Sequence, residues 1–182
     1  MRLLAVSGSL RAMSYNSALA RAAADLAPAG VEVEVFDGLA ALPMFDADIE
    51  GDDVAAVRHL RESIAEADAV LFVTPEYNGS IPGVLKNAVD WASRPRGEAA
   101  LAGKTVAVAG ASTGQYGALW AQQDLRRVLG VAGARVVCGD LPVGRAQSVC
   151  DPSGAPSPIV AERLRNHIAE LCREAAPLRA AA

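Results

Sequence analysis

One stretch decides the fold of this chain: Ser7-Gly8-Ser9-Leu10-Arg11-Ala12-Met13-Ser14-Tyr15-Asn16. The apolar run before it, residues 2–6, has the length of a buried parallel strand and is too short for a helix. After it, apolar residues recur with the spacing of one helix face, at Leu19, Ala22, Ala23 and Leu26. We therefore predict that the stretch is the turn that joins a buried strand to a helix.

The polar residues of this turn suit an anion. Gly8 allows a tight turn without a Cβ clash, and Ser9 and Ser14 offer hydroxyl groups. Arg11 adds a planar guanidinium with five N–H donors. Asn16 or Ser17 is a good N-cap, so the free N–H groups and the positive end of the helix point to the same place. We interpret the turn as a phosphate-binding loop.

The turn matches neither of the common nucleotide-binding motifs. It lacks the Lys-Ser/Thr ending of a P-loop and is not G-x-G-x-x-G, so neither an NTPase nor a standard dinucleotide fold is favoured. The alternative is an ordinary strand-to-helix turn with a solvated Arg11, because Ser and Asn are common where helices begin.

Composition limits the classes of protein that this chain can form. With 182 residues, of which 52% are hydrophobic and 21% charged, we expect one globular domain over residues 1–176 and a disordered, Ala-rich tail over 177–182. No apolar run reaches the roughly 18 residues of a bilayer span, and the N-terminus leads directly into the first strand. We expect a cytoplasmic protein with no membrane partner. A net charge of −4 without a basic stripe argues against nucleic acid.

Cysteine and histidine positions indicate no metal site. The three cysteines, Cys138, Cys150 and Cys172, are odd in number and contain no C-x-x-C pair, which favours reduced thiols over a disulfide or a zinc site. His59 and His167 each lie in a helical pattern without a partner at matching spacing. We expect both to be solvent-exposed.

The rest of the chain repeats the alternation of strand and helix. Further strands are predicted at residues 31–36, 69–73, 105–109 and 135–138, and further helices around 54–64, 84–92, 118–128 and 160–171. Residues 37–52 and 142–158 are expected to be long connections. Each crossover is long enough for a right-handed βαβ unit. These features predict an α/β fold, a doubly wound five-stranded parallel sheet with helices on both faces and the strand order 2-1-3-4-5.

Two more unusual loops follow predicted strands. They are Pro75-Glu76-Tyr77-Asn78-Gly79-Ser80-Ile81-Pro82-Gly83 and Gly110-Ala111-Ser112-Thr113-Gly114-Gln115-Tyr116-Gly117. In a sheet of order 2-1-3-4-5 these two loops and the first converge on one crevice beyond the carboxyl ends of the strands. Such convergence would be a coincidence if the first turn were ordinary. Tyr77, Tyr116 and glycine-flanked amides suit a flat heteroaromatic group.

These motifs together resemble the NADPH-dependent FMN reductase family, a flavodoxin-like group that includes quinone, chromate and azo reductases. The resemblance rests on Gly8-Ser9-Leu10-Arg11 with Ser14 and Asn16, on Pro75-Glu76-Tyr77-Asn78 with Ser80-Ile81-Pro82-Gly83, on Leu85-Lys86-Asn87-Ala88 through Asp90-Trp91, and on Gly110-Ala111-Ser112 with Gly114 and Gly117. It runs over nearly the whole chain and is weaker after residue 156.

The resemblance implies an FMN site and a homo-oligomer, either a homodimer or a homotetramer. The residues implied around the phosphate are Ser9, Arg11, Ser14 and Asn16, with Ser17 nearby. Those implied along the ring and the ribityl chain are Pro75, Glu76, Tyr77, Asn78 and Gly79, with Ser112 and Gly114 on the other side. For Trp91 we favour a packing role or a subunit contact, and for Lys86 and Asp90 an i,i+4 ion pair.

The function that this implies is an FMN-dependent NAD(P)H oxidoreductase. A hydride would pass from NADPH or NADH through FMN to a small acceptor, such as a quinone, an azo compound, a free flavin or chromate. No catalytic side chain is needed, which agrees with a sequence that has no Ser-His-Asp set. The alternatives are a flavodoxin-like one-electron carrier and a non-catalytic flavin-binding or sensing protein. Against the carrier stand the mild charge of −4 and Arg11 in the phosphate loop.

Overall fold

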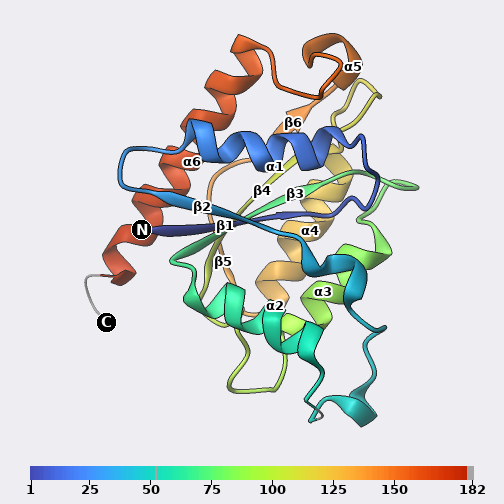
Figure 1. The fold of residues 1–182 in the computed structure, drawn as a ribbon, viewed down its shortest axis with the longest axis vertical. Coiled ribbons are helices and arrows are strands. Elements are labelled where there is room, and N and C mark those ends of the chain that lie inside the picture. Colours follow the sequence, from blue (N-terminus) through green and yellow to red (C-terminus); the bar gives the residue numbers. More distant parts are fainter. Residues whose placement is uncertain (52, 180–182) are drawn as a thin grey trace.

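A parallel sheet in the order β2-β1-β3-β4-β5 forms the centre of the protein (Figure 1). The structure is a computed structural model that describes residues 1–51 and 53–179. Its strands are β1 (Arg2–Ser7), β2 (Glu32–Phe36), β3 (Ala69–Thr74), β4 (Thr105–Ala111), β5 (Arg135–Val136) and β6 (Leu141–Val143). The predicted doubly wound sheet and its strand order are confirmed.

The sixth strand was not predicted. β5 and β6 both pair with β4, through Val106 opposite Val136 and Ala109 opposite Leu141. Between them Cys138 has a φ of 60°, so the strand predicted over 135–138 stops early and the edge resumes at Leu141. Pro142 is tolerated because one side of an edge strand faces solvent, so a residue without a main-chain N–H breaks no hydrogen bond of the sheet there. The connection predicted over 142–158 also contains a short helix, α5 (Ala146–Val149).

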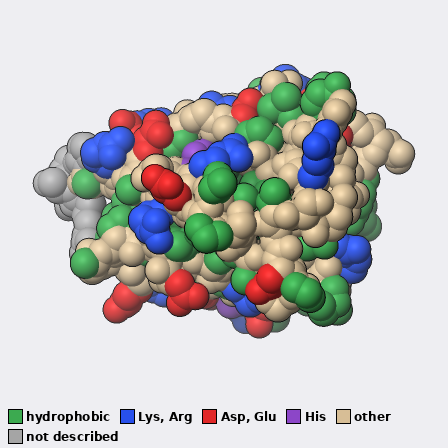
Figure 2. All heavy atoms as spheres, turned by 90° about the horizontal axis from the view of Figure 1, so that it is seen from above, with side chains coloured by type: hydrophobic (Ala, Val, Ile, Leu, Met, Phe, Trp, Pro, Cys, Tyr) green, Lys and Arg blue, Asp and Glu red, His purple; other side chains and the backbone are tan. Residues whose placement is uncertain are grey.

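Helices cover both faces of the sheet (Figure 1). One face carries α1 (Tyr15–Leu26) and α6 (Pro158–Arg179), and the other carries α2 (Ala55–Glu66), α3 (Gly83–Ala92) and α4 (Leu119–Val131). α6 includes residues 177–179 of the tail that was expected to be disordered, while 180–182 lie outside the described residues. On the face seen from above in Figure 2, acidic and basic side chains are interspersed without a large patch of either sign. In the described chain, no helix has the length and apolar character needed to cross a membrane.

Side chains of β1 show why this arrangement is stable. Leu4 and Val6 enter the core beneath α2 and α3, whereas Leu3 and Ala5 enter the core beneath α1 and α6. This is the two-residue alternation of a strand that is buried on both faces. β2 lies at the edge, as its Glu32 and Glu34 indicated, and exposes one side.

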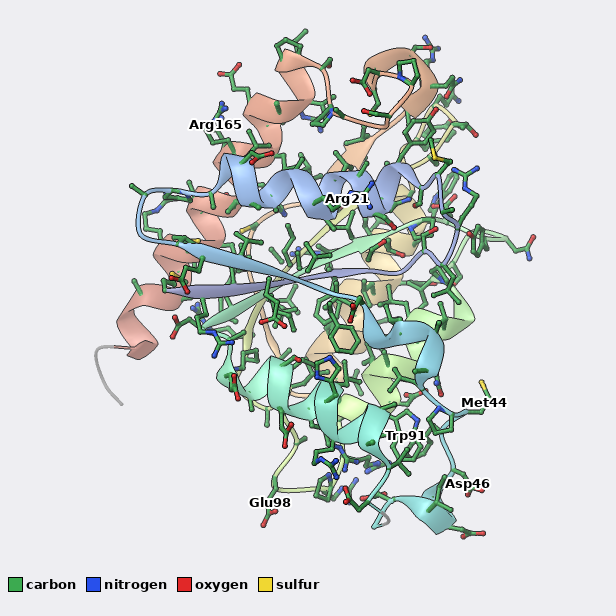
Figure 3. The ribbon with its side chains drawn as sticks, in the orientation of Figure 1. Arg21, Met44, Asp46, Trp91, Glu98 and Arg165 are labelled. Atoms are coloured by element: carbon green, nitrogen blue, oxygen red, sulfur yellow. The ribbon has the colours of Figure 1, made fainter. Side chains whose placement is uncertain are left out.

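Residues 37–52, expected to be a surface loop, are partly fastened to α3. They contain two short 3₁₀ helices, η1 (Gly38–Ala41) and η2 (Ala47–Ile49). Trp91 Nε1 donates to the carbonyl oxygen of Pro43 (2.8 Å), and the Phe45 N–H donates to Asn87 Oδ1 (2.7 Å). Figure 3 shows Trp91 on the same side of the molecule as Met44 and Asp46, with Met44 directed outward. The predicted packing role of Trp91 is confirmed, since only 1% of it is exposed.

Two other side-chain predictions have different outcomes. Lys86 Nζ lies 2.6 Å from Asp90 Oδ1, so the predicted ion pair is confirmed. His59 is exposed, as expected, but the prediction for His167 is wrong because its ring is buried and Nε2 donates to the Val108 carbonyl of β4 (3.1 Å). Burial lowers the pKa of His167. The three cysteines are free thiols, and burial raises the pKa of Cys138 to about 12.

Candidate active site

The loops that follow β1, β3 and β4 meet at the carboxyl edge of the sheet and enclose an open cavity of about 260 Å³. The cavity lies where the strand order reverses between β1 and β3, the usual position of a ligand in such sheets. Its lining residues are Ser9, Arg11, Ser14, Tyr15, Asn16, Pro75, Glu76, Tyr77, Ala111, Ser112 and Thr113. The structure therefore brings the three predicted loops together.

The first loop is shaped by its own hydroxyl groups. The Gly8 N–H donates to the Val73 carbonyl of β3 (2.8 Å), and the Ser9 N–H donates to Ser7 Oγ (3.3 Å). Ser17 Oγ lies 2.9 Å from Ser7 Oγ and does not line the cavity. Ser17 thus supports the loop from beneath.

The helix after this loop begins at a different residue from the one predicted. Ser14 is the N-cap of α1, and its Oγ accepts from the main-chain N–H groups of Asn16 (3.2 Å) and Ser17 (3.3 Å). The expected caps, Asn16 and Ser17, are therefore wrong. A cap precedes the first helical residue, and its side chain accepts from N–H groups two or three residues later, which only Ser14 can do here.

Asn16 has another task. Its side chain is 4% exposed, its Nδ2 donates to the Ala111 carbonyl (3.0 Å), and its Oδ1 accepts from the Ala111 N–H (2.8 Å). The amide therefore joins the start of α1 to the end of β4, across the floor of the cavity.

Arg11 supplies the charge at this end of the cavity. Its side chain is exposed, and among the described residues its guanidinium forms no ion pair or hydrogen bond. It lies on the loop just before the positive end of α1. Arg11 and the hydroxyl groups of Ser9 and Ser14 form a cationic, hydrogen-bonding surface suited to a phosphate.

The second loop contains a tight turn. The main chains of Tyr77 and Ser80 exchange two hydrogen bonds (3.0 and 3.1 Å), and between them Asn78 and Gly79 have φ values of 53° and 75°. Positive φ at both central positions makes this a type I′ turn, for which Asn-Gly is the preferred pair. Asn78 and Gly79 form the exposed tip and do not line the cavity.

The second loop is also fastened to α4. Glu76 Oε2 accepts from the Ala121 N–H (3.1 Å), and Ser80 Oγ donates to Asp124 Oδ2 (2.7 Å). The first of these bonds satisfies a free N–H in the opening turn of a helix. Glu76 thus lines the cavity while its carboxylate holds α4.

The third loop approaches its neighbours closely. A Cβ on Gly110 would lie 2.7 Å from the Thr74 carbonyl oxygen, so only glycine fits beside β3. The Ser112 N–H donates to the Val143 carbonyl of β6 (3.1 Å), which positions the loop over the cavity. Ser112 and Thr113 line the cavity, whereas Gly114 lies just beyond it.

Exposed aromatic side chains lie on these loops and at the start of α4. Tyr77 is 54% exposed, Tyr116 51% and Trp120 47%. The ring centroids of Tyr116 and Trp120 are 4.9 Å apart, with 54° between their planes. The sequence analysis did not identify Trp120 as a site residue. The helical spacing of Ala118, Ala121 and Leu125 already indicated that Trp120 lies outside the buried face of this helix. Tyr15 and Thr113, which line the cavity, were also missed.

Comparisons with known proteins identify the family of this chain. A family model described as NADPH-dependent FMN reductase matches residues 1–148. The chain is 47% identical over 130 residues to the NAD(P)H-dependent FMN reductase PA1204 of Pseudomonas aeruginosa, covering 71% of this chain and 69% of that protein. It is 45% identical over 128 residues to a 2-hydroxy-1,4-benzoquinone reductase of Burkholderia sp, covering 70% and 69% of the two chains.

A solved structure supports the likeness. The flavoenzyme NAD(P)H:(acceptor) oxidoreductase FerB of Paracoccus denitrificans superposes with a TM-score of 0.81 at 30% sequence identity. The match covers 94% of this chain and 97% of FerB.

Proposed function

Because the chain belongs to the NADPH-dependent FMN reductase family, we propose that it binds FMN in the cavity between the three loops and transfers a hydride from NADPH or NADH to a small acceptor. With a quinone as acceptor, NAD(P)H, a proton and the quinone yield NAD(P)⁺ and the hydroquinone. The names of the similar relatives, FMN reductase and quinone reductase, support this reaction.

The unpaired Arg11 at the cavity carries the proposal. This guanidinium has no protein partner among the described residues and lies beside two serine hydroxyl groups and a helix N-terminus. Such a cluster of donors is suited to bind a dianionic phosphate. The residues present therefore fit the phosphate end of FMN. We assign that end to Ser9, Arg11 and Ser14, while Asn16 and Ser17 hold the loop and the helix start in place.

The remaining loops would hold the flavin ring. We assign one side to the main chain of Pro75, Glu76 and Tyr77 and the other side to Ser112, with Gly114 beside it. Asn78 and Gly79 would contact only the part of the ring that extends beyond the cavity. Bound FMN supplies the hydride chemistry, so the task of these residues is to hold the ring and leave one face open.

Oligomeric state and location are part of the same proposal. A groove of about 540 Å³ between α3 and α4 is lined by apolar residues, among them the 83% exposed Val131, and by charged residues such as Lys86 and Arg127. Exposed apolar residues rimmed by polar and charged ones are typical of a surface that binds another protein, so we propose a homodimer or homotetramer. Three free thiols suit a reducing compartment, which supports a cytoplasmic location.

The test is oxidation of NADPH by the protein in the presence of FMN and a benzoquinone. We expect turnover that requires protein, FMN and quinone together. Tight FMN binding without any turnover would instead support the one-electron carrier, and failure to bind FMN would support a protein whose cavity serves another purpose.

A further inference from the structure

Tyr116, in the loop before α4, and Trp120, in the first turn of α4, form an exposed aromatic pair. Each ring is about half exposed, and the two rings contact each other at a tilt of 54°. Among the described residues neither side chain has a hydrogen-bond partner. Large aromatic rings held together at a protein surface offer a ready face for an apolar, planar molecule.

Tyr116 and Trp120 do not line the cavity themselves, but the chain and one hydrogen bond connect them to residues that do. Tyr116 belongs to the loop that supplies Ser112 and Thr113 to the cavity lining. Trp120 directly precedes Ala121, whose N–H binds the carboxylate of Glu76, another lining residue. Tyr77, 54% exposed, follows Glu76, so each partner in this hydrogen bond has an exposed aromatic residue as its neighbour in the chain.

The start of α4 is held firmly enough to present a fixed surface. Gln122 is fully buried; its Nε2 donates to the Gly117 carbonyl (3.0 Å), and its Oε1 accepts from the Leu141 N–H of β6 (2.9 Å). The bonds from Glu76 to Ala121 and from Ser80 to Asp124 fasten the opposite side. A binding surface on such a braced element loses little freedom when a ligand arrives.

We propose that the Tyr116–Trp120 pair docks the oxidising substrate and selects planar aromatic acceptors, quinones above all, over oxyanions such as chromate. The inference rests on the proposed reductase function and narrows its substrate class. Aromatic faces attract flat, apolar rings and offer no charge to an oxyanion.

The charged residues around the pair include both carboxylates and arginines. Glu76, bonded to the residue after Trp120, and Asp124, one turn further along α4, carry carboxylates that disfavour a second anion. Arg127 is engaged with Asp124 (3.7 Å), and the unpaired Arg11 lies at the phosphate end of the cavity. The exposed Arg145, whose main-chain N–H donates to the Gly114 carbonyl of the same loop (2.9 Å), is a further cation in these surroundings, so discrimination against oxyanions rests on the aromatic faces and the carboxylates.

A binding experiment tests the proposal without turnover. The chain has two tryptophans, and Trp91 is buried while Trp120 is exposed. In a Trp91→Phe variant loaded with FMN, tryptophan emission reports on Trp120 alone. We expect a 1,4-naphthoquinone, added without NADPH, to quench this emission along a saturating curve. Purely linear, collisional quenching would overturn the proposal.

Kinetics provide the second readout. In Trp120→Ala we expect kcat/KM for the naphthoquinone to fall about fivefold while kcat/KM for chromate and FMN affinity stay unchanged. Trp120→Phe, which keeps an aromatic face, should retain most of the quinone activity. Equal losses with both acceptors, or no loss with either, would overturn the inference and leave the reductase function intact. Failure to bind FMN, or no turnover in the unaltered protein, would mean that the proposed function itself is wrong.

Discussion

Asn16 and Ala111 are 95 positions apart in the sequence and are joined by two hydrogen bonds, from Asn16 Nδ2 to the Ala111 carbonyl (3.0 Å) and from the Ala111 N–H to Asn16 Oδ1 (2.8 Å). This amide bridge fastens the phosphate loop and the start of α1 to the end of β4. The distance between the first and third loops, and hence the width of the cavity, depends on it.

Replacing Asn16 by alanine should destabilise the fold. The change leaves a buried N–H and a buried carbonyl at Ala111 without partners, at a cost of about 2–4 kcal/mol in the free energy of unfolding. Urea denaturation measures this cost. Asn16→Asp keeps the acceptor but buries a carboxylate against the Ala111 carbonyl oxygen, so it should destabilise the protein at least as much as Asn16→Ala. An unchanged midpoint in Asn16→Ala would show that the bridge contributes nothing to stability.

Replacing Arg11 by alanine should weaken FMN binding and leave stability unaltered. The guanidinium has no protein partner in the described structure, so its loss removes only the bond to the phosphate, about 1.5–3 kcal/mol. Titration of the protein with FMN, followed by flavin fluorescence, measures the affinity. Arg11→Lys keeps the charge without the planar donor fork and should fall in between. Equal FMN affinity in Arg11→Ala would contradict the phosphate assignment.

Replacing Glu76 should lower both stability and FMN affinity, because its carboxylate holds the start of α4 beside the cavity. Glu76→Ala leaves the Ala121 N–H unbonded, and we expect a loss of about 1–3 kcal/mol of stability together with weaker FMN binding. Glu76→Gln still offers an acceptor oxygen, and it should restore most of the stability in thermal or urea unfolding. If the glutamine variant were as unstable as the alanine variant, the charge and not the hydrogen bond would be the important feature.

His167 should make stability fall in mild acid. Burial lowers its pKa in the folded state below the unfolded value of about 6.5. The charge of Arg126 lowers the pKa further. The hydrogen bond to the Val108 carbonyl and the charges of Glu170 and Asp140 raise it and so oppose the shift. The unfolded chain therefore binds the proton more readily. The stability that His167 contributes is complete above about pH 6.5 and is lost as the pH falls through the folded pKa.

Urea unfolding between pH 7.5 and 5 would measure this loss. We expect a smaller decline with falling pH in His167→Gln than in the unaltered protein, whereas a variant of the exposed His59, His59→Gln, should keep the full decline. Identical pH dependence in all three proteins would show that His167 does not contribute.

Local pattern was enough to predict the sheet and its order. The turn after β1, the apolar runs of β3 and β4 and the glycine-rich loops all signal their structure within a few residues. β6 was not predicted because it has only three residues, one of them Pro142, and its extended conformation is stabilised by pairing with β4.

The site was predictable in outline only. The sequence indicated which loops meet, and most of the predicted residues do line the cavity. It could not show that the side chains of Asn16 and Glu76 bond to main-chain groups of Ala111 and Ala121, because those partners come close only when the sheet is formed. The burial of His167 likewise depends on how α6 packs against β4.

The most direct test of the reductase account is an anaerobic absorbance spectrum of the FMN-loaded protein before and after one equivalent of NADPH. We predict that the visible band of oxidised flavin disappears within seconds and returns when a quinone is added. A band that persists with FMN still bound would contradict the account, because the protein would then hold the cofactor without accepting a hydride.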